Sequence, residues 1–221
     1  MTDQGYSQAT SLQQNNDGIV IQAPVVKPRH VRFARIISNI LAPSTISLPF
    51  ILLVASYHAR NQLAAIAYAF IAFFFLCVGP LIYVVIGVRT GRLSDIDISR
   101  RSERAGPFLF GIVSVSVGLL VLSLTNGPRD LETALILTAI SAVFMMVTTL
   151  WWKISIHASS IAGAATMLTA LYGMVLLPSF LLLILVSWSR VVLRRHTVAQ
   201  VVAGSLLSIA LSLLVLKLRG I

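Results

Sequence analysis

The chain has 221 residues, of which 57% are hydrophobic and only 11% are charged. A soluble domain of this size could not bury so much apolar surface, whereas a lipid bilayer requires it. The composition therefore excludes a soluble protein and predicts a polytopic membrane protein.

The net charge of +10 comes from 17 Lys and Arg residues against 7 Asp and Glu residues. The basic residues lie at the ends of hydrophobic segments, where membrane anchoring and anionic headgroups account for them. No basic segment interleaved with aromatic residues lies outside the apolar runs, so nucleic acid is not an expected partner. Cys77 stands alone within an apolar run, so neither a disulfide framework nor a thiolate metal site is expected.

Residues 1–35 are expected to form a polar, disordered tail with a basic juxtamembrane end. The tail is rich in Gln, Asn and Ser and lacks the apolar core of a signal peptide. Basic residues just before the first apolar run place the N-terminus in the cytoplasm by the positive-inside rule. Residues 36–221 are expected to form the transmembrane domain.

The apolar runs within this domain predict an all-α transmembrane bundle of six or seven helices in the cell membrane, with no strand. The two runs between 157 and 189 are short, about 16 residues or roughly 24 Å each at 1.5 Å per residue. In chain order, the runs cover about 36–57, 63–88, 108–125, 131–151, 157–171, 176–189 and 197–216.

Polar clusters interrupt the apolar runs at 89–107, 153–157 and 189–200. Between consecutive clusters the chain crosses the membrane twice, and an even number of crossings returns it to the same face. We therefore expect all three clusters to meet on one side of the membrane. If the N-terminus is cytoplasmic, this is the cytoplasmic side.

These clusters contain the side chains that a phosphate-handling site needs. Arginine matches a pair of phosphate oxygens with two parallel N–H donors. One histidine can attack phosphorus while another donates a proton to the departing oxygen. His196 and Gln200 are four residues apart, so on a helix they would share a face and could touch.

The segments "KISIH" and "SRVVLRRHTVAQ" resemble the second and third signatures of the type-2 phosphatidic acid phosphatase superfamily, which is related to vanadium haloperoxidases. The family signatures are Lys-x6-Arg-Pro, Pro-Ser-Gly-His and Ser-Arg-x5-His-x3-Asp. Ser189, Arg190 and His196 match the third signature in spacing, and Ser155 and His157 match the second. The resemblance begins at about residue 89 and continues to the end of the chain.

This resemblance implies a metal-independent membrane lipid phosphatase without a cofactor. His196 would be the nucleophile that becomes phosphorylated, and His157 would protonate the leaving group. The expected substrate is an isoprenyl phosphate or diphosphate, or a phosphatidate-type lipid, whose tail stays in the bilayer. The phosphoryl oxygens would be held by Arg190, Ser155, Lys153, Arg104 and Arg101.

The first two signatures depart from the family pattern. Ile154 and Ile156 replace the Pro and Gly of the second signature, and the loss of Gly removes an easy approach of backbone to phosphate. In the first signature, Arg104 is followed by Pro107 and not by an adjacent proline, and Asp97 occupies the Lys position.

Gln200 stands where the family has the Asp that orients the nucleophilic histidine. An amide oxygen can accept the imidazole N–H bond but adds no negative charge. In serine-protease triads the equivalent replacement of Asp by an amide costs about 10⁴ in rate. The alternative function is therefore a weak or inactive relative that acts as a lipid-binding membrane protein.

A second alternative is a metal-dependent membrane prenyltransferase. Asp95 and Asp97 could hold Mg²⁺ on a lipid diphosphate. Such enzymes use a second acidic cluster, and the acids Asp130 and Glu132 are expected on the opposite face of the membrane. The metal-independent phosphatase, with no metal site, is the interpretation that these patterns favour.

Overall fold

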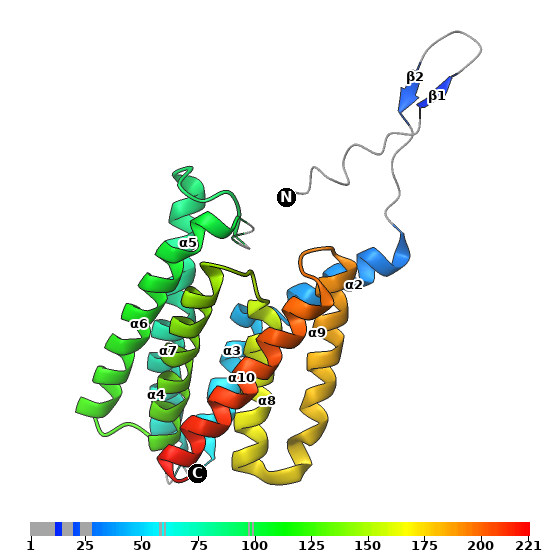
Figure 1. The fold of residues 1–221 in the computed structure, drawn as a ribbon. Helices are drawn as coiled ribbons and strands as arrows, with labels where there is room; N and C mark the ends of the chain where they lie inside the picture. Colours follow the sequence, from blue (N-terminus) through cyan, green and yellow to red (C-terminus); the bar gives the residue numbers. More distant parts are fainter. Residues whose placement is uncertain are drawn as a thin grey trace.

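The structure is a computed structural model that describes residues 12–14, 20–22, 28–57, 59, 61–96, 98 and 100–221. Its helices stand side by side in one bundle, which confirms the all-α class (Figure 1). Leu12–Gln14 (β1) and Val20–Gln22 (β2) pair antiparallel in the N-terminal tail. The described residues from 28 onward form only helices and connecting segments, as expected for the transmembrane domain.

The first expected helix is a bent pair, α2 (Arg29–Ile40) and α3 (Pro43–Ser56). Their axes differ by 43°. The cause is Pro43, because a proline pushes the preceding residue out of the helical region, and Ala42 is extended with ψ 145°. The boundary expected between residues 35 and 36 falls inside α2.

Seven further α-helices complete the described bundle. Gly173–Ser179 forms a 3-10 segment that joins two of them, and Arg101–Glu103 forms a single 3-10 turn. The helices are α4 (Gln62–Phe73), α5 (Gly79–Arg89), α6 (Ala105–Leu124), α7 (Arg129–Thr149), α8 (Ile156–Tyr172), α9 (Phe180–Val192) and α10 (Val198–Arg219).

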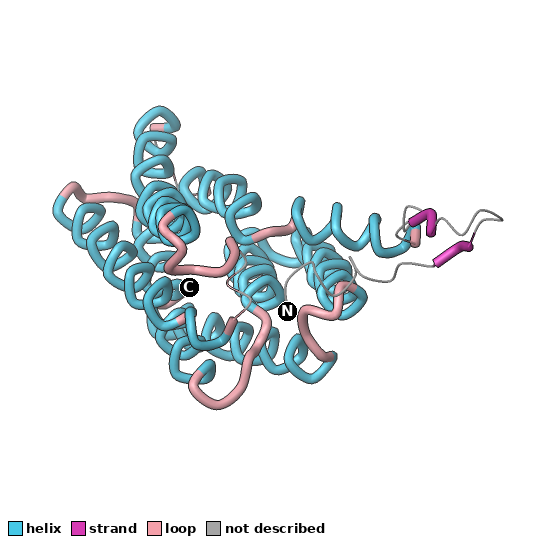
Figure 2. The backbone as a smooth tube through the Cα atoms, turned by 90° about the horizontal axis from the view of Figure 1, so that it is seen from above, coloured by secondary structure: helices cyan, strands magenta, loops and turns pink. Residues whose placement is uncertain are grey.

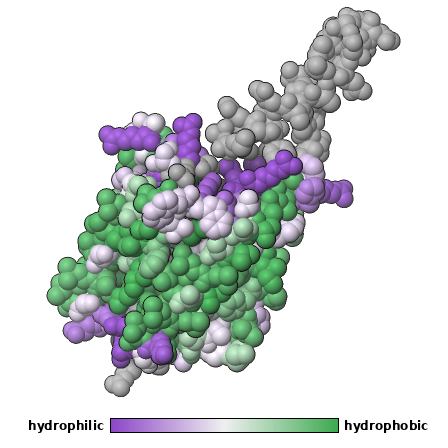
Figure 3. Space-filling view, viewed as in Figure 1, coloured by the Kyte–Doolittle hydropathy of each residue, from purple (hydrophilic) through white to green (hydrophobic). Residues whose placement is uncertain are grey.

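Within the described residues, five helical stretches are long and apolar enough to cross a membrane, and the α2–α3 pair would make a sixth. One of the five, Ile156–Val192, reverses at the 3-10 segment, so that α8 and α9 form an antiparallel hairpin (Figure 1). A broad apolar belt covers the visible face of the bundle, with polar residues gathered at its two ends (Figure 3). The chain is therefore a multi-pass membrane protein.

A π-helical segment, Phe74–Val78, joins α4 to α5. The Gly79 N–H donates to the Phe74 carbonyl, as the i→i+5 pattern requires. The next carbonyl, that of Phe75, would need an N–H from Pro80, which has none. Instead, Ser114 Oγ on α6 donates to it at 2.6 Å. The π segment is therefore a consequence of Pro80 and is held by a neighbouring helix.

Helices α8 and α10 pack closely along their length because small residues face each other at the contact. A Cβ added to Gly204 would lie 3.0 Å from the Ser155 carbonyl oxygen. Ser159 Oγ donates to the Gly204 carbonyl at 2.7 Å. This contact fixes the start of α8 against the start of α10, where the second and third polar clusters lie.

Candidate functional site

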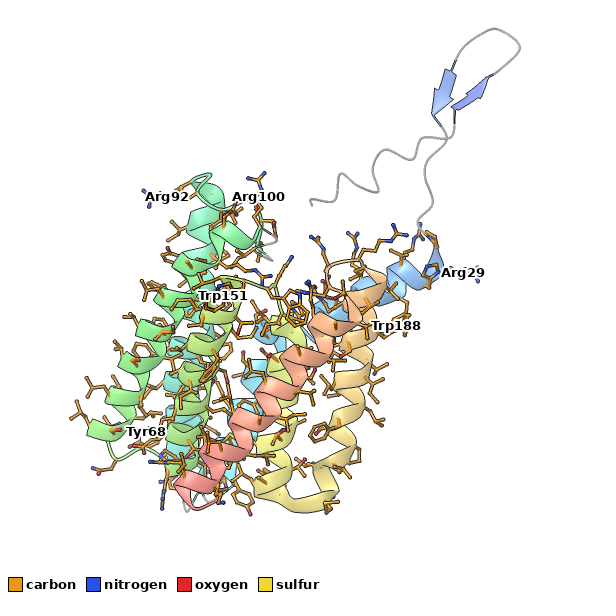
Figure 4. All side chains as sticks on the ribbon, viewed as in Figure 1. Arg29, Tyr68, Arg92, Arg100, Trp151 and Trp188 are labelled. Carbon is orange, nitrogen blue, oxygen red and sulfur yellow. The ribbon has the colours of Figure 1, made fainter. Side chains whose placement is uncertain are left out.

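A cavity of about 300 Å³ lies at the end of the bundle where the polar clusters gather. The first cluster contributes Ile98 and Arg104 to its wall, the second contributes His157, and the third contributes Arg190 and His196. The expected convergence of the three clusters on one side is therefore confirmed. Trp151 and Trp188 lie at this same end, whereas Tyr68 lies toward the other (Figure 4).

His157 reaches the cavity because α8 begins just before it. The Ser155 hydroxyl accepts from the Ala158 N–H at 3.4 Å and so caps the helix. The Ser155 N–H donates to the Gln200 carbonyl at 3.3 Å, which ties this turn to α10. Ser155 is fully buried and does not line the cavity, so its observed contacts are those of a structural cap.

His196 lies one residue before Thr197, the N-cap of α10. The Thr197 hydroxyl accepts from the Gln200 N–H at 3.3 Å, and Gln200 Oε1 accepts from the Thr197 N–H at 3.2 Å. The same Oε1 atom lies 3.2 Å from His196 Nδ1. The expected contact between His196 and Gln200 is confirmed, but a capping box makes it and not a shared helix face. Because an amide oxygen only accepts, this contact favours the tautomer with hydrogen on Nδ1 and a free lone pair on Nε2.

Arg190 is buried in the last turn of α9. Its Nη1 donates to Ser38 Oγ on α2 at 2.8 Å. Its carbonyl accepts from the N–H groups of Arg195 and His196 at 3.1 and 3.4 Å, closing the turn that follows α9. One residue thus presents a guanidinium to the cavity and positions the backbone of His196. Ser38 has no local sequence signal and was not predicted.

Arg104 is buried immediately before α6, and its Nε donates to the Ile98 carbonyl at 3.1 Å. The neighbouring Glu103 accepts from the Ser94 N–H at 2.7 Å and from the Ser94 hydroxyl at 2.8 Å. These bonds lower the pKa of the Glu103 carboxyl, with a smaller contribution from Arg100 at 3.4 Å. Glu103 therefore fastens the loop that carries Arg104.

Lys153 is half-buried and does not line the cavity. Burial is the largest of the causes that lower its pKa to about 8, and the charges of Arg104 and Arg190 are the next. Burial also lowers the pKa of His196 to about 3, with Arg190, Lys153 and Arg104 as the next causes. The His196 imidazole is therefore neutral at pH 7, which is the form that can act as a nucleophile.

The side chain of Arg101 and the whole of Asp97 lie outside the described residues. Among the residues that the structure does describe, no group of three His, Cys, Asp or Glu side chains could hold a metal ion. Ser189, the first residue of the third signature, is fully buried, and its hydroxyl donates to the Val186 carbonyl at 2.7 Å.

A second, apolar cavity of about 190 Å³ adjoins the first. Pro43, Leu76, Phe108 and Ile156 line both cavities. From there the second cavity continues between α3, α7 and α8 as far as Gly163. The polar site therefore has an apolar continuation into the membrane-spanning part of the bundle.

The arrangement offers two imidazoles, two guanidinium groups and an apolar extension, which together suit an anionic group attached to a hydrocarbon chain. Comparison with known protein families, with curated proteins and with solved structures finds no match to this chain. The likeness to the phosphatase superfamily rests on the spacing of the residues quoted above.

Proposed function

We propose that the chain is a membrane lipid phosphatase. It hydrolyses the phosphate or diphosphate headgroup of an isoprenyl phosphate or phosphatidate-type lipid through a phosphohistidine intermediate. The observation that carries this proposal is that Arg104, Arg190, His157 and His196 line one cavity. The guanidinium groups of the two arginines offer N–H donors to phosphoryl oxygens.

In the first step, His196 Nε2 attacks phosphorus, a P–N bond forms, and the bond from phosphorus to the ester oxygen breaks. His157 must be the imidazolium for this step, and it gives that proton to the departing alkoxide. In the second step, water attacks the phosphohistidine and gives a proton to His157. The P–N bond then breaks, so inorganic phosphate leaves and both histidines return to their starting states. Gln200 Oε1 holds the Nδ1 proton of His196 throughout.

The adjoining apolar cavity supports a lipid substrate over a soluble phosphate ester. Its wall includes Leu76, Phe108 and Ile156, which also border the polar site. The carbons next to the phosphate would leave water on entering this space, and that burial is favourable. The rest of the tail would remain in the bilayer.

The proposed orientation has the N-terminus and the site on the cytoplasmic face. Helix α2 with its basic residues lies at the same end of the bundle as the site (Figure 1), and the positive-inside rule places such residues in the cytoplasm. The test is a Ser94→Cys chain in intact cells, with Ser94 in the loop near Arg104. Labelling by an impermeant thiol reagent added outside would contradict this orientation.

Two other functions give different outcomes in one assay, phosphate release from a panel of lipid phosphates in the presence of EDTA. Release with EDTA present supports the metal-independent phosphatase. Release that EDTA abolishes would indicate a metal enzyme, the class to which a prenyltransferase belongs. No release would indicate a lipid-binding relative, a possibility raised by the amide at Gln200.

A further inference from the structure

Helix α2 has three distinct faces. One face is buried and packs against α9, and its members are Val31, Ala34, Ile37 and Ser38. A second face is apolar and exposed, with Phe33, Ile36 and Ile40 each more than half exposed. The third carries Arg32 and Arg35. Arg29 lies at the start of the helix on the side of the apolar face, and all three arginines are exposed.

The exposed apolar face of α2 is continuous with the membrane-facing surface of the bundle. The Phe33 ring lies 6.1 Å from the ring of Trp188 on α9, and tryptophan favours the membrane–water interface. The views from the front and from above both show α2 extending sideways from the bundle at the site end (Figures 1 and 2). In the membrane interface, the exposed apolar side chains of such a helix contact lipid hydrocarbon and its arginines contact anionic headgroups.

We propose that α2 lies in the membrane interface and binds an anionic lipid surface, and that this docking positions Arg190 through Ser38. The buried face of α2 presents Ser38 Oγ to Arg190 Nη1 at 2.8 Å. Ser38 is 3% exposed, so water does not readily replace it as the hydrogen-bond partner. A shift of α2 away from α9 therefore moves or breaks one of the bonds that orients the guanidinium.

The docking is tested on the full chain in vesicles, independently of any activity. An environment-sensitive fluorophore is attached to Ile36→Cys in a Cys77→Ala background. In vesicles of phosphatidylcholine and phosphatidylglycerol, we expect quenching by lipids brominated on their acyl chains and little quenching by aqueous iodide. Strong iodide quenching in these vesicles would overturn the proposal.

The role of charge is tested by the same probe with Arg29→Gln, Arg32→Gln and Arg35→Gln introduced together. In mixed vesicles, we expect iodide to quench this variant more than it quenches the chain with native arginines. The chain with native arginines should show the same increase in vesicles of pure phosphatidylcholine. Equal quenching of the native-arginine chain in the two kinds of vesicle would overturn the requirement for an anionic surface.

The link from α2 to Arg190 rests on the proposed function. It is therefore also tested without turnover, by measuring the binding of inorganic phosphate by calorimetry. Ser38→Ala should weaken phosphate binding severalfold, and Ser38→Thr should restore it by supplying a hydroxyl.

The effect of docking on turnover is measured with a water-soluble phosphate ester. The native chain should hydrolyse it severalfold faster on mixed vesicles than on phosphatidylcholine vesicles, and the triple Gln variant should lose only that increase.

These results separate the two proposals. If the native chain hydrolyses nothing, the proposed function fails, while the quenching and phosphate-binding measurements still decide the inference. If Ser38→Ala binds phosphate as well as the native chain does, the link through Ser38 is overturned even for an active enzyme.

Discussion

The two ends of the bundle use arginine in different ways. At the end away from the site, Arg219 lies 3.1 Å from the Glu132 carboxylate and donates to the Thr133 hydroxyl at 3.1 Å. Arg129 donates to the Arg219 carbonyl at 2.7 Å. These contacts join the start of α7 to the end of α10 and match positive with negative charge.

At the site end, the hydrogen bonds seen from Arg190 and Arg104 go to the neutral oxygens of Ser38 and Ile98. Besides burial, Arg190, Lys153 and Arg104 lower the pKa of the nearby His196, and Asp95 acts on Lys153 in the opposite sense. A cluster of like charges is costly in a protein and becomes favourable when an anion binds between them. The far end thus pairs opposite charges directly, whereas under the proposed function the basic groups at the site end would hold the phosphate.

The largest expected effect is that of His196→Ala, which tests whether His196 reacts with the substrate or only contributes to the electrostatics of the site. Replacing His196 with Ala should lower turnover by about 10³-fold or more, since it removes the nucleophile. It should also abolish any acid-labile phosphoprotein formed from labelled substrate. His30→Ala, at an exposed histidine of α2, is the matched control and should keep native activity. Full activity in His196→Ala would end this mechanism.

A smaller loss is expected from His157→Ala, on the order of 10²-fold, because general acid catalysis contributes this much or more. The loss should shrink for substrates with a good leaving group, which need less protonation. The measurement compares phosphate release from an alkyl and a nitrophenyl phosphate. An equal loss for both substrates would argue that His157 does not act as the acid.

The comparison between the two ends is tested directly by one substitution at each. Arg190→Gln should raise KM for the lipid phosphate about 30-fold, equivalent to about 2 kcal/mol for a charged hydrogen bond. Arg219→Gln should leave KM unchanged and cost about 1 kcal/mol of stability, because a partly exposed ion pair contributes little. Steady-state kinetics and thermal unfolding in detergent measure both variants. The reverse pattern would contradict the assignment of the two ends.

Substitutions of Gln200 test whether a negative charge beside His196 would raise turnover. Gln200→Glu keeps the length of the side chain and the capping box, and its carboxylate stabilises the cationic phosphohistidine-like transition state, so turnover should rise about 10-fold. Gln200→Asp should raise it less, because the side chain is shorter. Gln200→Leu should lower turnover and weaken the cap of α10 by about 1 kcal/mol. If the Leu variant matches the native rate, residue 200 does not orient His196.

The smallest expected effect is a pH dependence carried by Lys153. Its pKa is lowered to about 8, so the ammonium is present below that pH and is lost above it. KM should therefore rise severalfold as the pH passes through about 8 on the way to 9.5. Lys153→Arg should give a flat profile over this range, since guanidinium stays charged. A native profile that is equally flat would show that Lys153 contributes no charge to binding.

Much of the fold was predictable because hydrocarbon demands uninterrupted apolar helices. The runs that became α6, α7 and α10 were placed to within a few residues. The meeting of His157 and His196 at one end followed from the parity of the crossings between them. What the pattern missed was local: the bend before Pro43 and the π segment before Pro80.

Within the site, the resemblance to the family signatures selected His157, His196, Arg190 and Arg104, because each signature is a short pattern that can be read along the chain. The contact from Arg190 to Ser38 crosses 152 residues and has no sequence signature. Ser155 was selected as a phosphate ligand from its place in the second signature, and in the structure its hydroxyl caps α8. Periodicity decides which segments cross the membrane and on which side their ends meet. Only the packing of α2, α8, α9 and α10 decides which polar atoms then lie within hydrogen-bonding distance, because that depends on helix rotation and separation at the scale of an ångström.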